Sequence, residues 1–130
     1  MIRRIKSENT PKPAGCYSQA TRVGNLIFTA GQLPVDPTTG KALKGASPAE
    51  QTRRILKNIA ALLEENGSSL EKVAKATVLI RDVTLWDEVN KAYSEFFTGP
   101  VPPARTVASG IDIHNGLDVE IDVIAEVGDS

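Results

Sequence analysis

The stretch SPAEQTRRILKNIAALLEENG, residues 47–67, contains the clearest local structural signal in the chain. Ser47 suits the position that caps a helix N-terminus, Pro48 suits the first helical position, and Glu50 can complete a capping box. The final glycine of the stretch is typical of a residue just beyond a helix. Apolar residues follow the cap at helical spacing: Ile55, Leu56, Ile59, Leu62 and Leu63. The stretch therefore predicts a helix over residues 48–66 with one buried stripe and a charged outer face.

Extended segments lie on both sides of this helix. Alternation of apolar and polar residues predicts six strands, over residues 2–6, 17–23, 26–32, 73–81, 104–109 and 119–127. The first of them alternates weakly and reads as an edge strand. Gly24-Asn25 is a turn pair that joins the second and third strands into a hairpin. Residues 9–15 contain two prolines and a glycine and are predicted to form a loop.

A second helix is predicted after the fourth strand. Thr84 is its expected cap, Asp87 its third residue, and Gly99 marks its expected end. The predicted order is therefore β-β-β-α-β-α-β-β. Two helices interleaved with strands favour one α+β domain over residues 1–130, a six-stranded mixed sheet with both helices on one face.

The opposite face of the sheet is expected to be half apolar. Alternation places Ala74 on the apolar side of the fourth strand. The residues that it assigns to the open face of the sheet are Thr29, Gly31, Arg105, Val107, Glu120 and Ile124. Such a face is better covered by another subunit than by water, which predicts a closed homo-oligomer with the site near the subunit boundary. The monomeric alternative requires Leu79, Val107 and Ile124 to be exposed to solvent.

Composition excludes several classes of function. The 130 residues carry a net charge of −1 and no block of basic residues, so nucleic-acid binding has little electrostatic support. One cysteine, Cys16, cannot form an internal disulfide and fits a reducing compartment. Cys16 and the single histidine, His114, cannot build an ordinary zinc site. The N-terminal residues lack the apolar core of a signal peptide and no apolar run approaches a membrane span. We therefore expect a cytoplasmic protein, or one of an organelle matrix if a targeting segment was removed.

Pro102 and Pro103 separate the second helix from the strand that begins with Ala104 and Arg105. An arginine between small residues has two interpretations: a solvated surface charge, or a planar fork that grips a carboxylate. Glu120, which we expect on a neighbouring strand, could orient or deprotonate a water molecule.

Two further positions have open interpretations. Gly31, inside a strand, indicates either a bulge or a close approach of ligand to backbone. Asn90 is either solvated or directed into a pocket. Together with Arg105 and Glu120, these groups suit addition of water to a small, reactive carboxylate and do not suit cleavage of a very inert bond.

Five separated motifs resemble one family, in the right order from about residue 7 to residue 127. They are Gly15-Cys16-Tyr17-Ser18-Gln19-Ala20, Thr29-Ala30-Gly31-Gln32-Leu33-Pro34, Asn90-Lys91-Ala92-Tyr93-Ser94-Glu95-Phe96-Phe97, Pro103-Ala104-Arg105 and Val119-Glu120-Ile121. The family is RidA (YjgF/YER057c/UK114), the reactive-intermediate deaminases. The resemblance implies a chorismate-mutase-like fold and a homotrimer with sites between subunits. It also implies cofactor-free hydrolysis of enamine/imine carboxylates, such as 2-aminoacrylate and 2-iminopropanoate, to 2-oxo acids and ammonia.

The resemblance also implies residue roles. Arg105 corresponds to the arginine that pairs with the substrate carboxylate, and Glu120 to the acid that positions the attacking water. Tyr17, Gly31 and Asn90 correspond to substrate-binding positions: the pocket tyrosine, the glycine whose backbone contacts substrate, and the helix asparagine near the site.

The chain departs from the family pattern in three places. Cys16 replaces a usual proline, and Val107 replaces the cysteine that many deaminases carry. Residues 109–116 replace a common leucine-proline loop, which leaves the choice of substrate and the family branch open. Two alternatives to the deaminase therefore stand: a non-catalytic binder or regulator that recognises small carboxylates, and, less favoured because of the acidic pI, an endoribonuclease or translation inhibitor.

Overall fold

Six strands form one mixed sheet in the computed structural model, which describes residues 1–8 and 10–128. Their order across the sheet is β1-β2-β3-β6-β4-β5, where only β4 and β5 run parallel among the paired neighbours. The bounds are β1 Arg3–Ile5, β2 Ala20–Val23, β3 Leu26–Thr29, β4 Val73–Ile80, β5 Ala104–Ala108 and β6 Val119–Glu126. The predicted hairpin and the edge position of the first strand are thus confirmed. Asn9, the first residue of the predicted 9–15 loop, lies outside the described residues.

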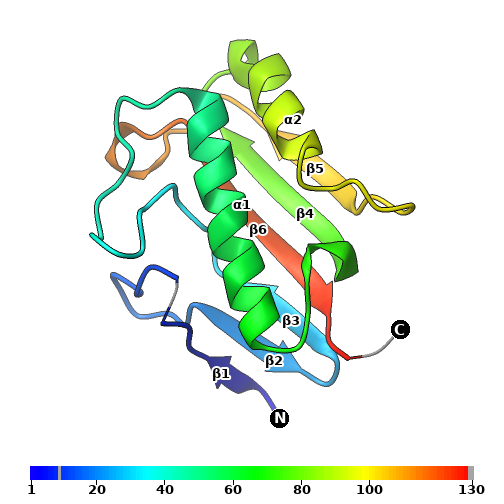
Figure 1. Cartoon of the computed structure of the whole chain (residues 1–130). Coiled ribbons are helices and arrows are strands. Elements are labelled where there is room, and N and C mark those ends of the chain that lie inside the picture. Colours follow the sequence, from blue (N-terminus) through cyan, green and yellow to red (C-terminus); the bar gives the residue numbers. More distant parts are fainter. Residues whose placement is uncertain (9, 129–130) are drawn as a thin grey trace.

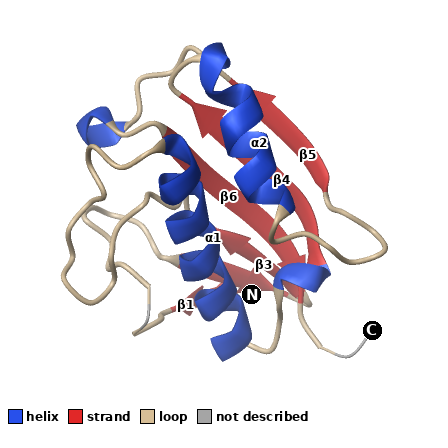
Figure 2. Cartoon of the chain, turned by 45° about the horizontal axis from the view of Figure 1, so that its top comes forward, coloured by secondary structure: helices blue, strands red, loops and turns tan. Residues whose placement is uncertain are grey.

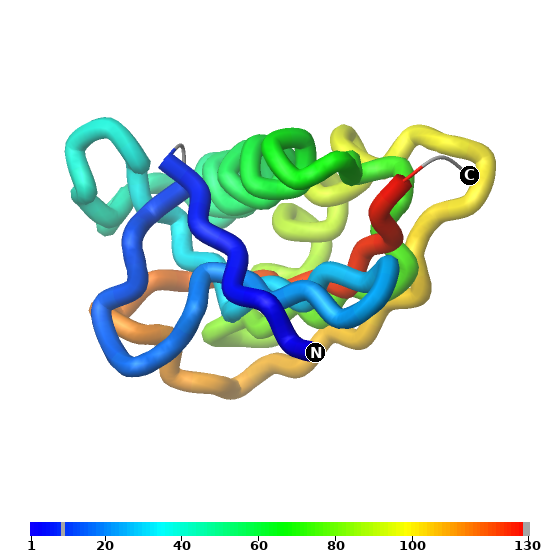
Figure 3. The backbone as a smooth tube through the Cα atoms, turned by 90° about the horizontal axis from the view of Figure 1, so that it is seen from below, coloured from blue at the N-terminus to red at the C-terminus, as the bar shows by residue number. Residues whose placement is uncertain are grey.

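Two α-helices cover one face of this sheet, α1 over Pro48–Glu65 and α2 over Trp86–Ser94 (Figure 1). The view along the sheet in Figure 3 places both helices on the same side, with the strands forming a second layer. Short 3₁₀ turns occupy Leu70–Lys72 (η1), Val83–Leu85 (η2) and His114–Gly116 (η3). The predicted α+β class and the order β-β-β-α-β-α-β-β are confirmed. No helix in the described part of the chain is long and apolar enough to cross a membrane.

Helix α1 follows its sequence signals closely. The Ser47 hydroxyl accepts a hydrogen bond of 3.1 Å from the Glu50 amide, and Pro48 is the first helical residue. The apolar stripe is buried against the sheet, where it forms the centre of the hydrophobic core. Two buried polar residues tie loops to the helix: Asn58 Nδ2 donates to the Val35 carbonyl, and Gln51 pairs with Asp118 through both its amide nitrogen and its oxygen. These pairings satisfy groups that burial would otherwise leave without partners.

The second strand begins at Ala20, three residues later than predicted. Tyr17 N donates to the Gly15 carbonyl in a tight turn, so the backbone is not extended at that point. The buried Gln19 side chain instead donates to the carbonyls of Ser7, Thr10 and Pro11 and holds the N-terminal loop against the sheet.

The second helix is shorter than predicted, and Thr84 does not cap it. Asp82 Oδ1 accepts from the Thr84 amide and caps a 3₁₀ turn. The α-helix follows this turn, with Leu85 at its N-cap position and no side-chain cap. The helix ends at Ser94, not near Gly99, because the last amides bond three residues back and tighten the final turn.

The predicted open face is wrong for Arg105 and Val107. In the parallel pair of β4 and β5, Arg105 lies opposite Ala76, and Val107 lies opposite Val78. Ala76 and Val78 are buried beneath the helices, and residues paired across strands share a face. Arg105 and Val107 therefore lie on the helix-covered face.

Two smaller corrections concern β3 and β4. Ile27 is buried whereas Phe28 is 37% exposed, so alternation places Thr29 with Ile27 on the helix-covered side. Val73 is buried but Ala74 is exposed, because a register shift between Val73 and Lys75 interrupts the alternation.

Candidate functional site

Arg105 lies on β5, the edge strand that Figure 2 shows at the side of α2. Its Nη1 donates a 2.8 Å hydrogen bond to Asn90 Oδ1. Its guanidinium carbon lies 5.1 Å from the ring centroid of Trp86 and 4.7 Å from that of Tyr93. Trp86, Asn90 and Tyr93 are four and three residues apart along α2, so they project from one side of the helix. We call this set the Arg105 clamp: Trp86, Asn90, Tyr93 and Arg105.

The clamp leaves most of the arginine's hydrogen-bonding capacity free for another group. A guanidinium has five N–H donors in one plane, and among residues 1–8 and 10–128 the bond to Asn90 uses one of them. Aromatic rings attract the cation through its faces and compete for none of these donors. The arrangement can therefore offer a charged, forked donor to a planar carboxylate.

Glu120 lies on the other face of the sheet. It is paired with Leu79 across β4 and β6. The residues before and after Glu120 in β6 are buried, so Glu120 and Leu79 lie on the face away from the helices. Its carboxyl group lies against Gly31: a methyl group built on Gly31 would lie 2.8 Å from Glu120 Cδ and closer still to Oε2. The missing side chain at residue 31 thus makes the room that the carboxyl group occupies.

A bulge places Gly31 in this position. Phe28 pairs with Ile124, and Gln32 pairs with Ile121, so four steps along one strand match three along the other. The extra residue turns residue 31 toward Glu120 instead of toward the core. Of the two interpretations of the strand glycine, the bulge is confirmed, and the approach of a ligand to its backbone stays a prediction.

The carboxyl groups on this face are less acidic than usual. Burial raises the pKa of Glu120, the nearby charge of Asp122 raises it further, and His114 opposes the shift. Burial also raises the pKa of Asp122. A carboxyl group with a raised pKa is a suitable proton donor or acceptor nearer to neutral pH.

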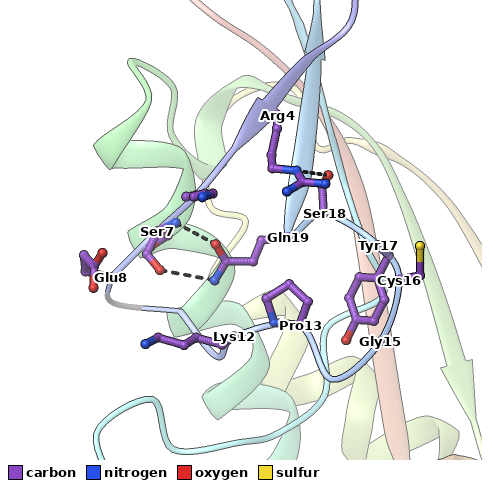
Figure 4. Close-up of a pocket in the computed structure, with 11 residues that line it drawn as sticks. Arg4, Ser7, Glu8, Lys12, Pro13, Gly15, Cys16, Tyr17, Ser18 and Gln19 are labelled. Carbon is purple, nitrogen blue, oxygen red and sulfur yellow. Dashed lines mark hydrogen bonds between the residues drawn. The ribbon is translucent and has the colours of Figure 1, made fainter.

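Tyr17 and Gly31 line one cavity of about 560 Å³ together with Gln32, His114 and Asn115. Tyr17 comes from the loop before β2, and its hydroxyl accepts a 3.2 Å hydrogen bond from the Ala14 amide. Figure 4 shows the other side of this loop, where the Cys16 thiol points away from the Tyr17 ring. Cys16 is exposed.

The structure brings the predicted site residues together in two groups rather than one. Arg105 and Asn90 are in direct contact in the clamp, whereas Glu120 lies against Gly31, which lines one cavity together with Tyr17. The prediction that Glu120 lies on the strand next to Arg105 is wrong, because β4 separates β5 from β6. Within one chain Arg105 and Glu120 lie on opposite faces of the sheet.

Three contributors were not predicted as site residues: Trp86, Tyr93 and His114. The helical spacing of Trp86 and Tyr93 around Asn90 is a signal that could have identified the first two. The nearness of His114 to Glu120 depends on how residues 110–116 fold and has no local signal. Over residues 1–8 and 10–128, no three histidine, cysteine or acidic side chains group closely enough to hold a metal ion.

Comparisons with known proteins match nearly the whole chain. A family model described as Endoribonuclease L-PSP matches residues 7–127. A RutC family protein of Pyrococcus abyssi is 46% identical over 121 residues, 93% of this chain and 94% of the relative. The 2-iminobutanoate/2-iminopropanoate deaminase of Escherichia coli K12 is 35% identical over 127 residues, 96% of this chain and 98% of the relative. The crystal structure of Escherichia coli TdcF with bound serine matches with a TM-score of 0.89 and 30% identity, covering 97% of this chain and 99% of that one.

Proposed function

The chain belongs to the YjgF/RidA family, and on that basis we propose that it hydrolyses 2-imino carboxylates to 2-oxo acids and ammonia. The Arg105 clamp is the observation that carries the proposal, because it holds a permanent cation with free in-plane donors where a small carboxylate can reach them. The relative named as a 2-iminobutanoate/2-iminopropanoate deaminase acts on such carboxylates, and the TdcF crystal holds serine, which also has a carboxylate.

The proposed reaction needs orientation more than activation. The carbon of a protonated imine is already electrophilic, so water can add to it once both are held in place. Arg105 binds the carboxylate, and the Glu120 carboxylate accepts a proton from the attacking water as its oxygen bonds to the imine carbon. Glu120 then passes this proton to the nitrogen of the resulting amino alcohol. The carbon–nitrogen bond breaks, ammonia leaves and takes up the hydroxyl proton, and the carbonyl of the 2-oxo acid forms. Gly31 supplies the room for the carboxyl group, and Tyr17 and Asn90 border the substrate.

The division of these residues between two faces supports a site made by two copies. We propose a homotrimer in which the Arg105 clamp of one subunit meets Glu120 and Gly31 of the next. Partly exposed apolar residues on the open face, including Phe28 and Leu26, are suited to burial between subunits. A cytoplasmic location fits the single exposed cysteine.

Subunit mixing tests the function and the shared site together. Arg105→Ala and Glu120→Gln are expected to abolish release of 2-oxo acid from 2-aminoacrylate generated by a serine dehydratase. When the two inactive variants are unfolded, mixed in equal amounts and refolded, about one site in four should combine an intact Arg105 with an intact Glu120. Recovery of about a quarter of wild-type activity is the expected result.

Other outcomes have separate meanings. No recovery in a correctly mixed trimer contradicts the intersubunit site. If the wild-type protein accelerates the decay of none of several amino-acid-derived imines but still binds 2-oxo acids, it is a carboxylate binder. If the protein cleaves RNA and both variants still cleave it, the ribonuclease activity belongs to other residues.

A further inference from the structure

Trp86 has an unusual place for a large aromatic residue. It is the first residue of α2 and is 37% exposed, yet its ring lies over the Arg105 guanidinium. Tyr93, the other aromatic residue of the clamp, is only 5% exposed and packs in the hydrophobic core. Burial thus explains the large aromatic side chain of Tyr93, but it explains that of Trp86 only in part. The contact with Arg105 gives the indole of Trp86 a second role.

The position of Trp86 is itself well determined. It follows the 3₁₀ turn Val83–Leu85, which Asp82 caps by accepting from both the amide and the hydroxyl of Thr84. The Trp86 amide in turn donates to the Val83 carbonyl. The indole is therefore attached to a backbone with satisfied hydrogen bonds rather than to a freely moving loop.

The guanidinium has little room to move toward the core. The space enclosed by Trp86, Tyr93, Arg105, Val107 and their neighbours amounts to only about 10 Å³, which is close to the minimum that can hold one water molecule. Without the indole, however, the long arginine side chain could swing toward solvent, and its rotamers would have to be ordered again each time a carboxylate binds.

We propose that Trp86 is a positioning residue that holds the plane of the Arg105 guanidinium ready for the substrate carboxylate. The inference rests on the proposed function, because it deepens the role of Arg105 as the carboxylate anchor. It assigns Trp86 no contact with the reacting carbon or nitrogen. Removal of the indole should weaken carboxylate binding and change the subsequent chemistry little, since the same anchor acts in ground state and transition state.

The stack can be tested without any ligand, because Trp86 is the only tryptophan in the chain. In the wild-type protein, tryptophan emission reports the surroundings of this one indole. Arg105→Lys and Arg105→Ala should shift or brighten the emission, whereas Arg22→Ala, on the distant strand β2, should leave it unchanged. Identical spectra for wild type and both Arg105 variants would overturn the proposed stacking.

The functional part is tested by calorimetric titration with 2-oxobutanoate. Loss of a partly exposed cation–π contact predicts that Trp86→Ala raises the Kd about 5-fold. Trp86→Phe should remain within about 2-fold of wild type, whereas Trp86→Leu, which keeps apolar volume but has no ring, should resemble the alanine variant. Val83→Ala, at an exposed position of the adjoining turn, is the matched control and should bind as wild type.

The possible failures are distinguishable. Equal Kd values for wild type, Trp86→Ala and Trp86→Leu contradict the positioning role. If the Kd values of the Trp86 variants correlate with their thermal stability and not with the presence of an aromatic ring, Trp86 has a structural role. That result also overturns the proposal. If 2-oxobutanoate binds as expected but no imine is hydrolysed, the proposed deaminase function fails while the role of Trp86 stands.

Discussion

Gly31→Ala is expected to separate catalysis from stability in this protein. The new methyl group would lie 2.8 Å from Glu120 Cδ and 3.3 Å from Cγ. Carbon atoms pack best at about 3.5–4.0 Å, so the carboxyl carbon must withdraw by roughly 0.7–1.2 Å, the difference between those distances and 2.8 Å. The obstacle is the end of a flexible side chain rather than backbone, so Glu120 can rotate away without disrupting the sheet.

The expected cost to catalysis is therefore much larger than the cost to folding. A displacement of about 1 Å in a catalytic group can reduce the rate by about 100-fold. Rotation of one partly exposed carboxyl group should change the free energy of unfolding by less than about 1 kcal/mol. The cause is steric, so Glu120→Asp, which retracts the carboxyl group by one methylene, should relieve the clash in the double variant.

The measurement is kcat/KM for imine hydrolysis, with thermal unfolding of the same preparations. Gly24→Ala is the control, because Gly24 has φ +57° but no atom near its missing side chain. That control should lose about 1–2 kcal/mol of stability through backbone strain and keep its activity. A folded Gly31→Ala protein with full activity would refute the proposed contact between residue 31 and the catalytic carboxyl group.

Two further predictions follow from charge and from burial. Burial and Asp122 raise the pKa of Glu120 whereas His114 lowers it, and the proposed mechanism needs Glu120 ionised. The acid limb of the pH–kcat/KM profile should therefore move to higher pH in His114→Gln and to lower pH in Asp122→Asn; shifts in the same direction would contradict the assignment of Glu120. In the core, Ile59 on α1 is 0% exposed, so Ile59→Ala should cost about 2–5 kcal/mol in urea unfolding, whereas exposed Ile2→Ala should cost less than about 0.5 kcal/mol.

Local signals predicted the elements of this fold better than their ends. Helix α1 could be predicted because its cap and buried stripe all lie within its own residues. Its partner α2 was predicted too long, and its start was placed at a Thr84 cap, whereas Asp82 caps a 3₁₀ turn from which α2 continues. Both residue types can cap a helix, and the choice between them depends on the 3₁₀ turn that packing imposes.

The face of the sheet on which each residue lies was harder to predict, because alternation gives only the relative orientation of residues within one strand. A period of two shows which residues of one strand share a face, but it does not show which face the helices cover. For β5, a strand of five residues, the answer depends on its register with β4, where Arg105 lies opposite Ala76. For β3, the bulge changes the alternation between Phe28 and Gln32, so Gly31 and Thr29 lie on different sides.

The separation of Arg105 from Glu120 changes how the competing functions should be judged. The Arg105 clamp by itself is a carboxylate-binding site, and nothing in its contacts requires catalysis. Glu120 by itself offers a carboxyl group with a raised pKa beside Gly31, whereas the Arg105 guanidinium lies on the other face of the sheet. The proposed hydrolysis requires Arg105 and Glu120 to meet, and within one chain they lie on opposite faces of the sheet. Catalysis in this protein should therefore depend on subunit concentration, and a stable monomeric variant that still binds 2-oxo acids should lack deaminase activity.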